Sequence, residues 1–316
     1  MTEKKAGEHG EEMKTKEAII ERQKDFIREM KNKTYALINS IDKSEIETIL
    51  LSGSVSRADF FPRKKENGEY DGMVDLIVMR KKGCDIKADD VFGPDQKPPI
   101  PYHCIKFDDV WFEILFTDFI DTEMFSQFEE PRKFSVLESQ ILYDPNNLYK
   151  NELEKINQLS KEELKNYLNG TLGYIHYLIS DYKKDRWYRR EAFIQLHENL
   201  NTAIRAGVRA LFYVNGFYSP AEDRAIYYSH SLPNLPENYA KLISQACNQN
   251  TDSEEDYFRR EKIFMENIVG FIRAEGLIPR PSGAKQGVLN PTAIPYENTI
   301  PRCSAAGLVI EKTKTC

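Results

Sequence analysis

The residue types that can hold a phosphate and a metal ion occur close together in one part of the chain. An apolar run ends in Gly53 and Ser54, and a second apolar run carries Asp75 near its start. Glycine lets a backbone approach a phosphate closely, and Ser54 would offer a hydroxyl and a backbone N–H at a helix start, where anions are favoured. Asp75 supplies the oxygen ligands that Mg²⁺ prefers. This order of residues predicts a phosphate-binding turn beside a divalent metal site.

Three more residues extend this set. Glu113 lies in the run VWFEILF, where it shares a strand face with Trp111 and Leu115, an unusual place for a charge without a partner. Ser56 and Arg57 follow the Gly-Ser turn, and both are candidate phosphate contacts. An ordinary solvated strand position for Glu113 and a structural ion pair for Arg57 are the alternatives.

Apolar patterning predicts the elements that must position these residues. Continuous apolar runs bounded by turn residues are typical of buried strands, and apolar residues at helical spacing indicate a helix. The expected elements are strands over 46–52 and 73–79, a hairpin around Asp108 and Asp109, a helix over 16–40, and a short helix over 119–128. Proline and glycine mark 62–72 and 80–99 as loops.

The second half of the sequence is patterned as helices. Ser160 and Glu163 fit a capping box, in which each side chain accepts a hydrogen bond from a backbone N–H at the helix start. On one long helix, Arg190 and His197 would share a face, although a solvated basic surface and a core histidine explain them as well. The expected helices cover about 187–214, 220–229, 236–248 and 253–274, in addition to the one that begins after Ser160.

These elements predict an α+β chain with two domains. A small mixed-sheet domain over 1–149, which includes the N-terminal helix, would carry the phosphate and metal residues. An all-α helical bundle over 150–276 would follow it, with the ligand cleft between the two domains. Residues 277–316 contain many residues that break helices and strands, and they show no sustained hydrophobic periodicity. We therefore expect an extended tail.

Composition argues against several classes of protein. A net charge of −6 gives no strong nucleic-acid signal, because a phosphate backbone attracts clustered positive charge. The five cysteines are scattered without CxxC spacing, which disfavours a disulfide framework or a structural zinc site and favours a reducing compartment. The N-terminus lacks an apolar signal region, and no run approaches the ~20 apolar residues of a membrane helix. A cytoplasmic protein without a membrane partner is therefore expected.

The Gly-Ser turn and the acidic strand after it resemble the DNA polymerase β-like nucleotidyltransferase superfamily. The resemblance is to bacterial aminoglycoside-type members with a C-terminal helical, HEPN-like domain, and it covers roughly residues 45–147. Gly53 and Ser54 match the Gly-Ser pair of the family. Asp75 matches the second aspartate of its Asp-x-Asp pair, and Glu113 matches its third carboxylate on a neighbouring strand.

The sequence departs from this pattern at the first aspartate of the pair. The position two residues before Asp75 is Met73, and a thioether is a poor ligand for a hard cation. On a regular strand Asp71 would lie on the same face but ~13 Å from Asp75. Asp71 reaches the metal only if Gly72 forms a bulge or turn, which is a common use of strand glycine beside active sites.

The resemblance implies transfer of a nucleoside monophosphate from a nucleoside triphosphate, with ATP as the default, to a hydroxyl on a small molecule or partner protein. Mg²⁺ or Mn²⁺ would assist the reaction. The implied catalytic and metal-binding residues are Asp75, Glu113 and Asp71, and the implied nucleotide-binding residues are Gly53, Ser54, Ser56 and Arg57. The alternatives are a catalytically degenerate nucleotide-binding or regulatory module and an enzyme that transfers AMP to a protein.

Overall fold

The computed structural model describes residues 16–58, 63–64, 66, 70–97, 101–118, 124–157 and 159–276. The chain divides into two compact units. The sheet unit comprises Met1–Ile120 and Ser139–Asn147, and the helical unit comprises Asp121–Glu138 and Leu148–Cys316. Each unit contains its own cluster of buried apolar side chains, which is what a separate domain requires.

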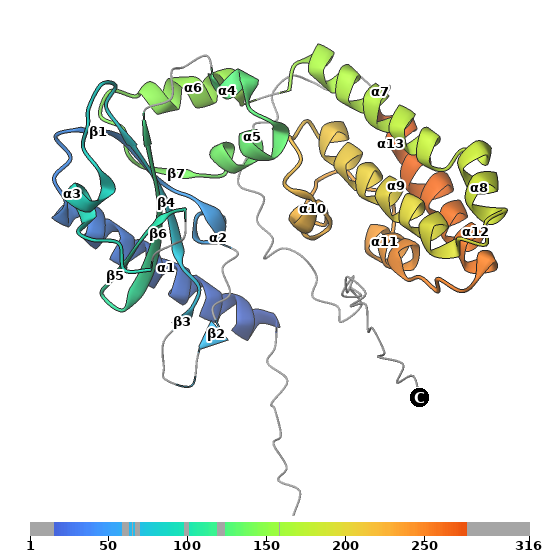
Figure 1. Cartoon of the computed structure of the whole chain (residues 1–316), viewed down its shortest axis with the longest axis horizontal. Coiled ribbons are helices and arrows are strands. Elements are labelled where there is room, and N and C mark those ends of the chain that lie inside the picture. The colour runs from blue at the N-terminus through green and yellow to red at the C-terminus, as the bar shows by residue number, and fades with distance from the viewer. Residues whose placement is uncertain are drawn as a thin grey trace, which may run out of the picture. The chain divides into compact units, whose positions relative to one another are not determined.

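A five-stranded mixed sheet forms the centre of the sheet unit (Figure 1). Its strands are β1 (Ile46–Leu51), β4 (Val74–Arg80), β5 (His103–Phe107), β6 (Val110–Asp118) and β7 (Gln140–Tyr143). The strand order is β5-β6-β4-β1-β7, and neighbours are antiparallel except for β4 and β6, which are parallel. This mixed sheet and the helices that follow it confirm the expected α+β class.

The helix α1 (Lys16–Ser40) packs against one face of this sheet. Its buried side chains, Phe26 and Met30 among them, form one apolar cluster with alternate residues of β4 and β6. These alternate residues are Val74, Leu76 and Val78 in β4, and Val110, Phe112 and Ile114 in β6. Because successive side chains of a strand point to opposite faces, Asp75 and Glu113 lie on the face away from this cluster.

The hairpin that was expected around two aspartates is confirmed. Strands β5 and β6 are antiparallel, and the last residue of one, Phe107, pairs with the first residue of the other, Val110. Asp108 has a φ of 48° and Asp109 a φ of 63°. Positive φ at both central residues is typical of a type I′ turn, whose twist matches that of the strands it joins.

Short elements occupy the segments in which the sequence indicated loops. Helix α3 (Ala88–Phe92) lies within the expected loop 80–99. Helix α2 (Gly53–Ser56) directly follows β1, where a short turn or helix was expected. A separate two-stranded sheet pairs β2 (Arg63–Lys64) with β3 (Tyr70–Asp71). Elements as short as α3, β2 and β3 do not produce a hydrophobic period, so the sequence pattern misses them.

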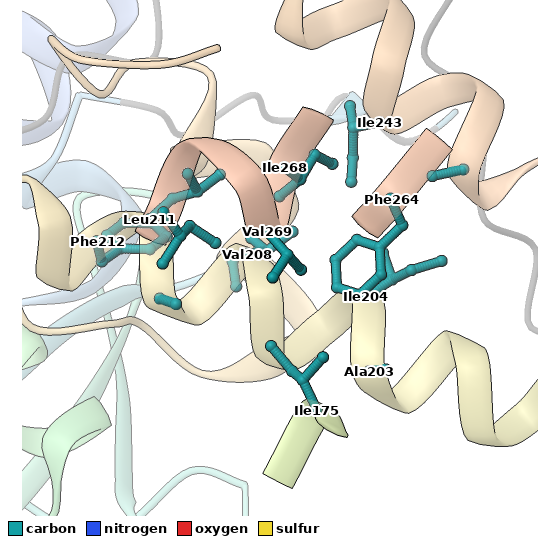
Figure 2. Close-up of a cluster of buried hydrophobic side chains, with 14 of the residues drawn as sticks. Ile175, Ala203, Ile204, Val208, Leu211, Phe212, Ile243, Phe264, Ile268 and Val269 are labelled. Atoms are coloured by element: carbon teal, nitrogen blue, oxygen red, sulfur yellow. The ribbon is translucent and has the colours of Figure 1, made fainter. Parts of the chain in front are cut away.

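The helical unit is built around one long buried helix. Its described elements are α4 (Met124–Gln127), α5 (Glu130–Leu137), α6 (Leu148–Ile156), α7 (Lys161–Leu178), α8 (Asp181–Tyr188), α9 (Phe193–Val214), α10 (Glu222–Ser229), α11 (Tyr239–Cys247), α12 (Glu254–Ile263), the π-helical η1 (Phe264–Val269) and α13 (Gly270–Gly276). The central helix is α9. Its residues Ile204 and Val208 belong to the same buried cluster as Ile175 of α7 and Ile268 of η1 (Figure 2).

The π-helical segment η1 packs against a glycine of α9. A Cβ at Gly207 would lie 2.5 Å from Cε2 of Phe264, so glycine leaves the space that the buried Phe264 ring occupies. A helix was expected over 253–274, and it is present, but its π-helical part was not foreseen. π-helical turns are rare and have no simple sequence signature.

The capping box in the helical unit is confirmed. The hydroxyl of Ser160 accepts a hydrogen bond from the Glu163 N–H at 3.1 Å, and the Glu163 carboxylate accepts one from the Ser160 N–H at 3.0 Å. No helix among the described residues is long and apolar enough to cross a membrane. The segment 277–316, expected as an extended tail, lies outside the residues that the structure describes.

The single helix expected over 187–214 is wrong. Helix α8 ends at Tyr188 and α9 begins at Phe193, and Glu191 between them has a φ of 52°. The Ala192 N–H closes this turn by donating to the Trp187 carbonyl at 3.0 Å. The turn contains neither glycine nor proline, so nothing in the local sequence indicates the break.

Candidate functional site

The Gly-Ser turn lies directly against the acidic strand. The Ser52 N–H donates to the Asp75 carbonyl at 2.9 Å, which joins the end of β1 to the start of β4. Gly53 has a φ of 65°, a conformation that favours glycine, and a Cβ there would overlap the Oδ2 atom of Asp75. Both the backbone conformation and the packing therefore require glycine at this position.

Asp75 and Glu113 are direct neighbours across the parallel strands β4 and β6. Adjacent strands lie ~4.8 Å apart, and the two residues share one face of the sheet, so their carboxylates are close enough to share a cation. Both side chains are half-buried. The sequence anticipated each carboxylate on a strand, and the register brings the two together.

Glu113 also has a neighbour on its other side. Cys104 of β5 pairs with Glu113 in the antiparallel register, and Cys104 is fully buried. Burial raises the pKa of the Cys104 thiol, and the negative charges of Glu113 and Asp95 raise it further. Among the described residues, no lysine or arginine forms an ion pair with Glu113.

The three polar residues of the turn differ in accessibility. Ser54 is half-buried, whereas Ser56 and Arg57 are only 6% and 4% exposed. Arg57 follows α2, and its N–H donates to the Gly53 carbonyl at 3.4 Å. A buried guanidinium is expected if Arg57 forms a structural ion pair and does not contact a phosphate. Ser54 is therefore the residue of this turn best placed to meet a ligand.

Asp71 is not continuous with the acidic strand. It belongs to β3, where it pairs with Arg63, and Gly72 with a φ of 134° separates it from β4. The conformational break at Gly72 is the condition under which Asp71 was expected to reach the metal. The Asp71 side chain lies outside the described part of the structure, so its role as a ligand stays a prediction.

Met73 lies among mostly apolar side chains. It lines a small hollow at the end of the sheet, which is also lined by Phe26 and Met30 of α1 and by Trp111 of β6. The one carboxylate in this lining is Asp109, whose side chain is 93% exposed and lies 3.8 Å from the Lys106 ammonium, so the hollow holds no buried oxygen ligand in place of the missing aspartate. In the described part of the chain, no group of three or more His, Cys, Asp or Glu residues could hold a metal ion. Asp75 and Glu113 thus fit one divalent ion, and the described residues supply no second acidic site.

The pair formed by Arg190 and His197 is not assembled in the helical unit. Arg190 lies in the turn before α9, where it is exposed, and His197 is fully buried within α9. The His197 Nδ1 accepts a hydrogen bond from Arg260 at 2.7 Å, and its Nε2 lies 3.3 Å from the Ser253 carbonyl. Burial, followed by the charge of Arg260, lowers the pKa of His197. The alternative of a core histidine is therefore the one that the structure supports.

Two residues near the carboxylates were not singled out from the sequence. Trp111 shares a strand face with Glu113, and the Lys97 ammonium lies 3.6 Å from the centroid of a Trp111 ring. Lys97 belongs to the segment that was expected only as a loop. No local pattern pairs these two residues, because their contact depends on where that segment lies beside β5.

The similarity of this chain to known proteins is distant. No protein-family model matches the chain, and no curated protein matches it. Among solved structures, the chain is similar to a nucleotidyltransferase-like protein from Exiguobacterium sibiricum 255-15, at 10% sequence identity and a TM-score of 0.37. That similarity covers 78% of this chain and 73% of that chain. A similarity this distant assigns no residue and no reaction, so both must be inferred from the geometry of the site.

Proposed function

We propose that this chain transfers a nucleoside monophosphate from a nucleoside triphosphate, with ATP as the default donor, to an acceptor hydroxyl. The observation that carries the proposal is the in-register pairing of Asp75 and Glu113 on one sheet face, with the Gly53 turn packed against Asp75. The carboxylate pair would bind the metal ion, and the turn with its half-buried serine would bind the phosphates. Nucleotidyl transfer needs both parts.

A divalent cation would stabilise this site during the reaction. Two carboxylates on neighbouring strands repel each other, and together they repel an incoming triphosphate. Mg²⁺ or Mn²⁺ held by Asp75 and Glu113 would offset both effects and stabilise charge on the phosphate oxygens. Nucleotide binding should therefore depend on the divalent ion.

The residues of the chain have separate tasks in this reaction. The turn at Gly53 and Ser54 binds the phosphates of the donor through its backbone and its hydroxyl. The acceptor hydroxyl oxygen forms a bond to the α-phosphorus, and the bond from that phosphorus to the bridging oxygen breaks. Pyrophosphate leaves, and Glu113 accepts the proton of the hydroxyl as the general base. Asp71 would complete the acidic set if its side chain turns toward Asp75.

A second candidate function is nucleotide binding without catalysis. Met73 favours it, because an apolar side chain stands where a metal-binding aspartate is expected. One ion held by Asp75 and Glu113 is sufficient to bind a nucleotide, whereas catalysis by two metals needs further oxygen ligands. A transfer of AMP to a hydroxyl of a partner protein differs from the main proposal only in the acceptor.

Calorimetry and pyrophosphate release test the proposal together. We expect wild-type protein to bind ATP with Mn²⁺ and to lose at least tenfold in affinity when EDTA replaces the metal. Asp75→Asn and Glu113→Gln should each cause a similar loss. Asp118→Asn is the matched control, because Asp118 lies on the same strand as Glu113 but pairs with Arg80 at 2.5 Å.

The outcomes separate the candidates. Metal-dependent binding together with pyrophosphate release supports the transferase, and metal-dependent binding alone supports the binding module. If ATP affinity is the same in EDTA and in both site variants, the carboxylate pair holds no nucleotide-bound metal and the proposal fails.

A further inference from the structure

The sheet face that carries the two carboxylates continues onto β5 and the segment beside it. In the register of β5 and β6, Cys104 pairs with Glu113 and Lys106 pairs with Trp111. Directly opposite residues of antiparallel strands share a face, so this part of the sheet adds an indole ring and a lysine next to the acidic pair.

The segment that carries Lys97 is fixed against the edge of the sheet. The Gln96 N–H donates to the Cys104 carbonyl at 2.8 Å, and the Lys106 N–H donates to the Gln96 side chain at 3.1 Å. The Asp95 carboxylate accepts hydrogen bonds from the backbone N–H groups of Lys97 at 2.9 Å and of Cys104 at 3.3 Å. These bonds lower the pKa of Asp95 and hold the backbone of Lys97 in place.

The Lys97 ammonium rests on the indole of Trp111. Its Nζ atom lies 3.6 Å from the centroid of a Trp111 ring, and the lysine side chain is half-buried. No carboxylate among the described residues forms an ion pair with it; the neighbouring lysine, Lys106, pairs with Asp109 at 3.8 Å. An ammonium has three donors, and contact with a ring face leaves donors available for an anion.

Strand order places this lysine opposite the phosphate-binding turn. In the sheet order β5-β6-β4-β1, the Gly53 turn follows β1, the carboxylates lie on β4 and β6, and Lys97 lies beside β5. In an in-line transfer the leaving group and the attacking hydroxyl lie on opposite sides of the phosphorus. If the triphosphate occupies the β1 side, the acceptor occupies the side of Trp111 and Lys97.

We propose that Lys97, held over Trp111, binds an anionic group, phosphate or carboxylate, on the hydroxyl acceptor. The identification of the bound molecule as the acceptor rests on the proposed transferase function. The anion site itself does not depend on that function. A fixed ammonium at this place attracts an anionic acceptor and repels a cationic one, so it sets specificity through charge.

Trp111 fluorescence reports on this site directly. The chain has two tryptophans, so Trp187→Phe leaves Trp111 as the single reporter. The probes are glycerol 3-phosphate, glycerate and glycerol, titrated without nucleotide or metal and with ionic strength held constant by KCl. We expect a saturable change in Trp111 emission with at least one of the two anions and none with glycerol. The anion that binds with the higher affinity shows whether phosphate or carboxylate is the preferred group.

Lysine variants made in the Trp187→Phe background assign the response to Lys97. Lys97→Met should weaken the anion response at least tenfold, and Lys97→Arg should retain it because the charge is kept. Lys81→Met is the matched control, because Lys81 is exposed and donates to the Ser44 carbonyl beyond the other end of β4. A response that survives Lys97→Met, an equal response to glycerol, or no response to either anion overturns the inference. Metal-dependent ATP binding is measured separately, so its failure would remove the transferase proposal without removing the anion site.

Discussion

The backbone of Gly53 lies so close to Asp75 that any Cβ on Gly53 would overlap the Asp75 carboxylate. The Ser52 N–H, one residue earlier, donates to the Asp75 carbonyl. The phosphate-binding turn and the acidic strand are thus fixed to each other by packing and by a backbone hydrogen bond. A change in one is expected to move the other.

Gly53→Ala should therefore remove metal-dependent ATP binding. The added methyl displaces the Asp75 carboxylate, and a positive φ in a residue other than glycine costs roughly 1–2 kcal/mol of stability. A tenfold or greater loss of ATP affinity in Mn²⁺ is expected by calorimetry, together with a lower midpoint of urea unfolding.

Gly83→Ala is the matched control for this change. Gly83 has a φ of 79°, and a Cβ there would meet nothing within 4 Å. It should cost a similar amount of stability through backbone strain and leave ATP affinity unchanged. Equal ATP affinity in Gly53→Ala and the wild type would mean that Asp75 has no part in nucleotide binding.

Two substitutions, Asp71→Asn and Met73→Asp, test the role of Asp71. If Asp71 turns toward Asp75 across Gly72, Asp71→Asn removes the negative charge of a metal ligand and should lower pyrophosphate release roughly tenfold or more. Met73→Asp supplies a carboxylate at the usual position, so it should restore release in the Asp71→Asn background. Glu66→Gln serves as the control, because Glu66 is exposed in the same polar segment. An unchanged rate in Asp71→Asn would leave Asp75 and Glu113 as the whole acidic set.

Gly207→Ala should destabilise the helical unit. The new methyl would lie 2.5 Å from the buried Phe264 ring, and overpacking of this kind typically costs about 1–3 kcal/mol. Gly170→Ala is the matched control on α7, because a Cβ there meets nothing within 4 Å, and alanine in a helix is favoured over glycine by about 1 kcal/mol. We expect the free energy of unfolding to fall in Gly207→Ala and to rise in Gly170→Ala. A rise in both variants would contradict the contact with Phe264.

Stability of the helical unit should fall as pH drops below about 6.5, the usual pKa of histidine. Burial and Arg260 lower the pKa of His197 in the folded protein, so the unfolded chain binds the proton first. The stability that neutral His197 contributes is fully present above the pKa of histidine in the unfolded chain. It is lost as pH falls toward the lowered pKa of His197 in the folded protein. His197 should contribute to this loss between pH 7.5 and 5.5.

The variant His197→Gln isolates this contribution. Burial lowers the pKa of His230 as well, so part of the pH dependence should remain in the variant. Urea unfolding at the two pH values measures the difference between wild type and variant. An identical change in the free energy of unfolding for both proteins would show that His197 does not titrate in this way.

Much of the sheet unit can be read from its sequence because the signals are local. The apolar runs predict β1 and β4, and the two adjacent aspartates predict the turn between β5 and β6. Alternation along each strand also predicts that Glu113 shares a face with Trp111 and points away from the α1 cluster. Short elements gave no such signal: β7 has four half-buried residues and no distinct apolar pattern.

Local sequence determined which residues could act, and tertiary structure decided which of them meet. The sequence shows Asp75 and Glu113 as carboxylates on strands, but only the parallel register of β4 and β6 makes them neighbours. Gly53 reads as a turn glycine, but its contact with Asp75 depends on strands joined through non-local hydrogen bonds. The placement of Lys97 on Trp111 likewise depends on a loop whose position β5 fixes. Contacts between distant segments arise from the packing of whole elements, and no window of sequence contains that information.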